Sequence, residues 1–132
     1  MPFVRIFLSP GFDESAARLI ADGVHDGVVQ AIGVPAEDRF QVVTRHESGD
    51  MIWDHTFLDV ARSDRGVFVN ITLAVGRDDD QKRELYAAIV RNVTTRAVVR
   101  PQDVLIVLTE TSRANWSFGN GVAHYAPAQA PQ

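Results

Sequence analysis

Four short runs of the chain place apolar side chains at every second position or carry mostly β-forming residues. Residues 4–8 and 69–73 alternate with a period of two, which is typical of a strand with one buried face. Residues 40–45 and 104–110 are rich in Val, Ile, Leu, Phe and Thr, residue types that favour strands. The pattern therefore predicts four strands.

Two longer segments carry apolar residues at a spacing of four, which predicts amphipathic helices. Asp13 is suited to cap the first helix, and Gly33 to end it. The acidic run 78–80 is expected to start the second helix, where the helix dipole favours negative charge, and Pro101 to stop it. The stripes are Ala16, Ile20, Val24, Val28 and Ile32 in the first helix, and Leu85, Ile89, Val93 and Ala97 in the second.

Residues 65 positions apart are similar along most of the first half, without a gap. The matched pairs include Phe3 with Phe68, Asp13 with Asp78, Val34 with Val99, Asp38 with Asp103, and Thr44 with Thr109. A constant offset of this kind indicates a duplication. Each copy is predicted to form a strand, a helix and a second strand. A right-handed crossover through the helix makes the two strands parallel.

The predicted fold class is α+β: two β-α-β units form a four-stranded mixed sheet with two helices on one face. One domain is expected for 1–132, because this length supports a single core. The units span about 2–46 and 67–110, with a connector at 47–66 and an aromatic loop and tail at 111–132. The bare face of the sheet leaves aromatic residues uncovered, which favours an oligomer.

The amino-acid composition limits which partners and which kinds of catalytic chemistry are expected. The net charge of -4 argues against a nucleic-acid or membrane surface. No apolar run approaches the ~20 residues that cross a bilayer, and we expect a cytoplasmic protein. The chain has no cysteine, and its four histidines lack the spacing of metal ligands. No metal is therefore expected.

The beginning of the chain offers a possible catalytic group. Initiator methionine is normally removed before a small residue, so Pro2 is expected to become the amino terminus. An α-amino group has a pKa near ~8 when unperturbed, and apolar surroundings lower that pKa. An amine for Schiff-base chemistry has only two sources here, Pro2 and the single lysine, Lys82. The alternative is that Pro2 reflects methionine removal alone.

Three further segments join Pro2 in a recognisable pattern. Residues 34–41 read Val-Pro-Ala-Glu-Asp-Arg-Phe-Gln, residues 76–77 read Gly-Arg before the second helix, and residues 115–119 read Asn-Trp-Ser-Phe-Gly. With these residues the chain resembles the tautomerase superfamily, and within it the malonate semialdehyde decarboxylase-like branch. Members begin with a catalytic proline, and single-chain members carry two fused β-α-β units. The resemblance covers nearly the whole chain.

The resemblance implies a role for five residues. Pro2 is the catalytic amine, Asp38 the active-site carboxylate, and Arg77 binds the substrate carboxylate, while Trp116 and Phe118 form apolar walls. It also implies a small oxo-acid substrate, no cofactor, and a homotrimer. Each residue has a structural alternative: Asp38 as a turn cap, Arg77 as a solvated charge, and the aromatic residues as core or oligomer contacts.

The particular reaction stays open at this point. A cationic proline would act as electron sink in decarboxylation, whereas tautomerisation needs a neutral amine that takes and returns a proton. Asp38 would raise the proline pKa, and Arg77 would lower it. Some members carry two arginines one residue apart, but here Val75 replaces the first. The alternatives are a tautomerase or hydratase acting on a 2-oxo acid, and a non-catalytic oligomeric binding protein.

Overall fold

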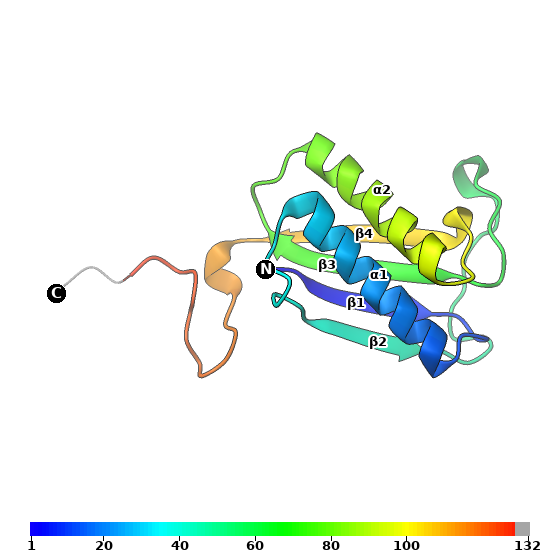
Figure 1. Ribbon diagram of the computed structural model, residues 1–132, viewed down its shortest axis with the longest axis horizontal. Coiled ribbons are helices and arrows are strands. Elements are labelled where there is room, and N and C mark those ends of the chain that lie inside the picture. The colour runs from blue at the N-terminus through cyan, green and yellow to red at the C-terminus, as the bar shows by residue number, and fades with distance from the viewer. Residues whose placement is uncertain (129–132) are drawn as a thin grey trace.

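Two β-α-β units follow one another in the computed structural model, which describes residues 1–128 (Figure 1). The bounds are β1 (Phe3–Leu8), α1 (Glu14–Ile32) and β2 (Gln41–Arg45), then β3 (Val67–Ala74), α2 (Asp79–Arg96) and β4 (Val104–Thr111). Three short 3-10 helices lie in the loops: η1 (Phe57–Asp59), η2 (Pro101–Asp103) and η3 (Arg113–Asn115).

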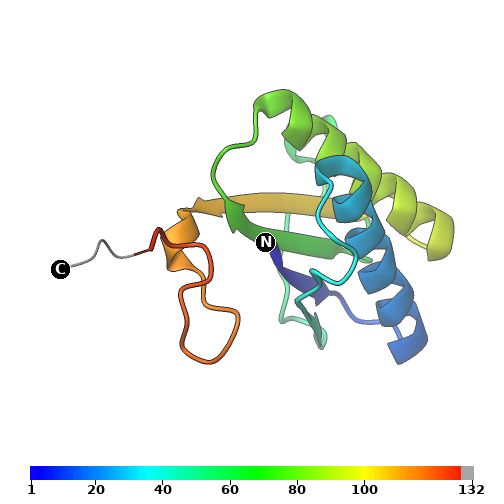
Figure 2. The same cartoon turned by 60° about the vertical axis from the view of Figure 1, so that its left-hand side comes forward.

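The sheet has the strand order β2-β1-β3-β4. The strands β1 and β2 pair in parallel, as do β3 and β4, while β1 and β3 pair antiparallel where the two units meet. Both helices cover the same face of the sheet (Figures 1 and 2). The predicted mixed sheet and the one-sided helical layer are therefore confirmed.

Both helices begin where capping residues predict. The Asp13 side chain accepts a hydrogen bond from the Ala16 amide at 2.7 Å. Asp78 caps α2 reciprocally with Gln81, through hydrogen bonds of 2.8 and 2.9 Å. The stop was predicted too far along the chain, because α2 ends at Arg96 and Pro101 instead begins η2.

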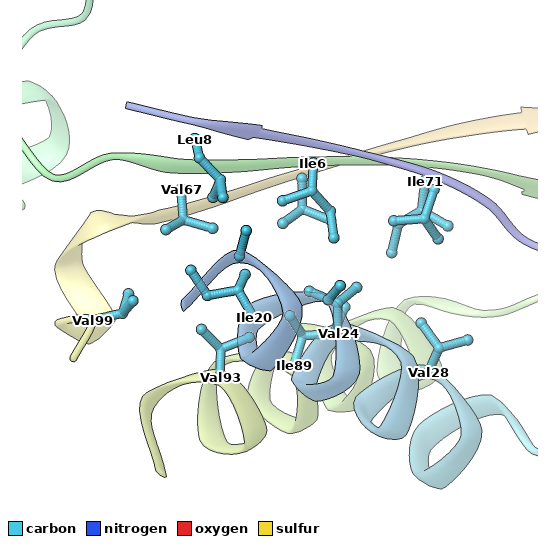
Figure 3. Packing of buried hydrophobic residues seen from close by; sticks show 14 of the residues in the cluster. Ile6, Leu8, Ile20, Val24, Val28, Val67, Ile71, Ile89, Val93 and Val99 are labelled. Carbon is cyan, nitrogen blue, oxygen red and sulfur yellow. The ribbon is translucent and has the colours of Figure 1, made fainter. Parts of the chain in front are cut away.

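The core lies between the helices and the covered face of the sheet (Figure 3). The period of two along the strands directs alternate side chains to this layer, and the helical stripes meet them there. Its largest fully buried side chains are Ile6, Leu8, Ile20, Val24, Val28, Val67, Val69, Ile71, Leu73, Leu85, Ile89 and Val93.

The two helices approach closely at Gly27 of α1. A Cβ atom added there would lie 2.7 Å from the Cα atom of Ile89 in α2. The obstacle is backbone, which cannot move aside as a flexible side chain can. This glycine therefore fixes how closely the helices pack.

On the opposite face, apolar side chains remain exposed. Val42 of β2 is 47% exposed and Val107 of β4 is 51% exposed. Both alternate with residues that pack on the core, so the side-chain period places them outward. The face away from the helices is therefore only partly bare, because Trp53 of the connector packs edge-on against Phe68 of β3 there. Among residues 1–128, no helix is long and apolar enough to cross a membrane.

We predict that Gly27→Ala lowers the free energy of unfolding by about 1–2 kcal/mol, because overpacking exceeds the gain in helix propensity. Urea denaturation followed by circular dichroism measures this change. Ser15→Ala, at an exposed position of the same helix, is the control and should change stability little. Unchanged or increased stability in Gly27→Ala would show that the helices separate without cost.

Candidate functional site

The amino end of β1 lies at the edge of the sheet where β2 also begins. The Val4 amide donates to the Phe40 carbonyl at 2.9 Å, which fixes the start of β2 beside β1. On the other side Phe3 lies opposite Thr72, so β3 ends at this same edge. Pro2 is buried there. The chain terminus thus lies between the start of β2 and the end of β3.

Asp38 reaches the amino terminus from the loop before β2. A turn closed by a 3.0 Å hydrogen bond from the Asp38 amide to the Pro35 carbonyl presents its side chain. The carboxylate forms an ion pair with the amino group of Met1 and is only 15% exposed. The nitrogen of Pro2 lies one residue along the chain from this contact. The structure thus brings Asp38 and the beginning of the chain together.

The equivalent position in the second unit is built differently. Asp103 is buried, and its carboxylate accepts hydrogen bonds from the Ser63 amide and the Ser63 hydroxyl, both at 2.7 Å. Ser63 belongs to the connector, which continues into the buried Val67 at the start of β3. Asp103 therefore acts as a cap for the connector. The Asp38 carboxylate instead pairs with the amino group of Met1.

Aromatic side chains from the loop after β4 lie over the same edge. The rings of Trp116 and Phe118 are stacked, with centroids 5.6 Å apart and planes 10° apart. Phe118 also meets Phe40 at 5.6 Å. The Phe118 amide also donates to Nδ1 of His124 at 3.1 Å, and Tyr125 packs edge-on against the Phe118 ring. The loop is thereby tied to the start of β2.

A cavity of about 370 Å³ lies between this loop and the strands. Phe3, Phe40 and residues 115–118 line it. Trp116 and Phe118 were expected as walls, whereas Phe3, Phe40, Asn115 and Ser117 were not singled out as lining residues. A signal was present for two of them, because Phe3 follows Pro2 and Phe40 lies two positions after Asp38.

Arg77 lies just beyond the end of β3, at the same edge of the sheet. Its guanidinium donates to the Ala74 carbonyl at 3.0 Å and is half-buried. Within residues 1–128, no hydrogen bond joins it to Asp38 or Pro2. Val75, the position of the missing arginine, is 53% exposed. Arg77 is thus near the terminus in topology without contacting the Asp38 ion pair.

These groups suit acid-base or covalent chemistry on a small anion. An amine at a sheet edge beside a carboxylate can hold or transfer a proton, and a secondary amine can attack a carbonyl carbon. The stacked rings line the cavity with apolar surface, beside which electrostatic interactions are stronger than in water. Residues 1–128 contain no group of three or more His, Cys, Asp or Glu side chains placed to hold a metal ion.

Comparison with known families identifies the class of protein. Two family models, each described as tautomerase enzyme, match residues 38–119 and residues 2–57. The chain is 35% identical to the probable tautomerase YusQ of Bacillus subtilis (strain 168), over 93% of this chain and 97% of the relative. YrdN, another probable tautomerase of that strain, is 30% identical over 95% and 96%. The chain belongs to the tautomerase family.

Comparison with solved structures gives a more specific resemblance within the superfamily. The FG41 malonate semialdehyde decarboxylase inhibited by 3-bromopropiolate has a TM-score of 0.88 and 36% identity, covering 93% of each chain. A second malonate semialdehyde decarboxylase, described with decarboxylase and hydratase activities, has a TM-score of 0.87 and 32% identity, covering 93% and 95%. Native fused 4-OT, at 19% identity and a TM-score of 0.75 over 92% and 95%, shares the fold.

The chain is therefore an enzyme of the tautomerase superfamily with the expected duplicated fold. This finding sets aside the alternative of a non-catalytic binding protein.

The repeat supplies a matched pair of substitutions. We predict that Asp38→Asn lowers turnover about 100-fold or more with little loss of stability, because its carboxylate serves the amine. Asp103→Asn should instead lower the free energy of unfolding by about 1–3 kcal/mol, since a buried acceptor of two hydrogen bonds is disturbed. Steady-state kinetics and thermal unfolding of both variants measure this. The reverse assignment of effects would contradict the asymmetry between the two units.

Proposed function

We propose that the enzyme decarboxylates a small 3-oxo acid, malonate semialdehyde, through the amino group of Pro2 after loss of Met1. The observation that carries the proposal is the placement of the amino terminus beside the Asp38 carboxylate at the start of a buried strand. The two malonate semialdehyde decarboxylases at 36% and 32% identity support this substrate class.

The chemistry needs an electron sink beside the carbonyl group of the substrate. When the bond between the carboxylate carbon and C2 breaks, carbon dioxide leaves and the bonding electrons pass toward the carbonyl oxygen. A Pro2 ammonium that hydrogen-bonds to this oxygen stabilises the developing charge. Protonation at C2 then gives acetaldehyde. Because the negative charge grows on the carbonyl oxygen during the step, a cation placed there favours the transition state over the substrate.

Asp38 holds the ammonium form of the amine in position, because its carboxylate forms an ion pair with the chain terminus. The aromatic walls at Trp116 and Phe118 surround the substrate with apolar surface, where the interaction between amine and carbonyl gains strength. These roles require the carboxylate to remain paired with the terminus once Pro2 has replaced Met1.

Arg77 supplies a cation for the carboxylate of the substrate. Its guanidinium lies beyond β3 at the edge where Pro2 begins, and one Nη1 hydrogen bond to Ala74 leaves other donors for a ligand. A planar guanidinium binds a carboxylate through two parallel hydrogen bonds. The substrate would then lie between Arg77 and the proline amine.

A tautomerase or hydratase acting on a 2-oxo acid is the second candidate. Val75 favours it, because the enzyme lacks one of the two arginines that some members carry there. The names of the two Bacillus subtilis relatives also support it. In that reaction a neutral Pro2 removes a proton beside a carbonyl group and returns it elsewhere.

Assembly as a homotrimer accounts for the bare face of the sheet. Val42 of β2 and Leu105 and Val107 of β4 are each at least 40% exposed, on the two outer strands of the sheet, and exposed apolar side chains on a sheet face are typical of an interface. A fused 4-OT that shares the fold is described as a symmetric trimer. A second and third copy would cover these side chains.

We predict that the enzyme releases acetaldehyde from malonate semialdehyde and that Pro2→Ala lowers this rate about 100-fold or more, because the secondary amine is lost. A coupled assay for acetaldehyde measures the rate, alongside ketonisation of phenylenolpyruvate. Folded protein that leaves malonate semialdehyde unchanged but ketonises phenylenolpyruvate would favour the second candidate. Full activity of Pro2→Ala on both substrates would overturn the proline mechanism.

We further predict that Arg77→Gln raises KM about 10- to 100-fold, the equivalent of one lost hydrogen bond to a charged group. Arg83→Gln is the control, because Arg83 is exposed on α2 and, among residues 1–128, pairs only with Asp80. Initial rates over a range of substrate concentrations separate KM from kcat. An unchanged KM in Arg77→Gln would place the carboxylate elsewhere.

A further inference from the structure

A buried histidine of α1 holds the loop that carries Asp38. Nε2 of His25 lies 2.8 Å from the Ala36 carbonyl oxygen, two residues before Asp38. A carbonyl oxygen can only accept, so Nε2 carries the proton and donates. His25 is 8% exposed. The contact is therefore protected from water and fixes the loop backbone immediately before the carboxylate.

A second attachment follows Asp38. Arg39 donates to Asp22 at 2.7 Å and to Gln41 at 2.9 Å, and the Gln41 side chain donates to the Ala21 carbonyl at 2.9 Å. The hydrogen bond from Arg39 holds the pKa of Asp22 below its ordinary value. This ion pair is partly exposed, which limits its strength. The buried contact of His25 is the firmer of the two.

The duplicated unit shows that the fold does not require these attachments. Val90 occupies the position equivalent to His25, and Ala87 the position equivalent to Asp22. In the same way, Val104 replaces Arg39. The second unit has the same helix and strand without them. In the part of the chain that the structure describes, these polar attachments thus occur in the unit whose aspartate faces the amino terminus and not in the other.

We propose that His25 is a positioning residue for Asp38: its Nε2–H holds the Ala36 carbonyl so that the carboxylate stays beside the Pro2 amine. The inference rests on the proposed function of Asp38 and Pro2. His25 itself lies behind the loop and acts through it. A displacement of about 1 Å at a catalytic group can lower turnover about 100-fold, so a loosened loop has a measurable effect.

The test compares His25→Val with His25→Gln in the protein lacking Met1. Valine is the residue of the second unit at this position, so it is compatible with the helix, but it cannot donate. Glutamine restores an N–H donor. We expect His25→Val to lower kcat about 10- to 100-fold with KM little changed. We expect His25→Gln to recover most of the loss, and hydrogen exchange at the Asp38 amide to quicken in the valine variant alone.

Asn92→Ala is the control for a general loss of stability, because Asn92 is buried between the helices and bonds Gln30 and the Ala88 carbonyl. It should lower the unfolding midpoint without changing kcat. Wild-type activity in His25→Val would overturn the positioning role, as would a loss of activity that Asn92→Ala reproduces. An inactive wild-type protein would instead count against the proposed function, and slow exchange at Asp38 in His25→Val would then count separately against the positioning role.

Discussion

The pairing of β1 between β2 and β3 is the constraint on which the candidate site depends. Val4, Ile6 and Leu8 of β1 are almost completely buried, and a slip of one residue would turn all three toward the uncovered face. The register is therefore fixed by burial. Because it is fixed, the chain begins at one defined edge of the sheet, with the loop of Asp38 on one side and the end of β3 on the other.

The duplication explains how the same β-α-β fold places two equivalent aspartates in different surroundings. In both units an aspartate precedes the second strand, but Asp38 meets a chain terminus while Asp103 binds the connector through Ser63. An internal strand cannot present an amine, so the second unit uses the equivalent carboxylate for stability. The first unit adds polar attachments to α1 around Asp38. If Asp38 serves the proline amine as we propose, catalytic and structural uses of the same position are divided between the copies.

Much of the fold was predictable because strands and helices leave a period in the sequence. The four strands, both N-caps and the one-sided helical layer follow from alternation, from the stripes, and from Asp13 and Asp78. The close approach at Gly27 was not predictable, since it depends on the position of another helix. The contact of Ser63 with Asp103 spans 40 residues and has no local signal.

The residues of the candidate site could be predicted from the sequence better than their arrangement in space. Pro2, Asp38, Arg77, Trp116 and Phe118 all lie at or near one edge of the sheet, but the loop that carries the two aromatic residues has no periodicity from which its path could be derived. His25 was missed as a positioning residue because a lone histidine on a helix carries no spacing signal. Its meaning appears only when its partner, Ala36, and its repeat equivalent, Val90, are compared.

Covalent labelling with 3-bromopropiolate, followed by peptide mass spectrometry, tests whether the proline amine is the reactive group. We expect a protein that lacks Met1 and carries a single adduct on the nitrogen of Pro2, formed in step with the loss of activity. Retention of Met1 in fully active protein, or inactivation with the adduct on another residue, would contradict it.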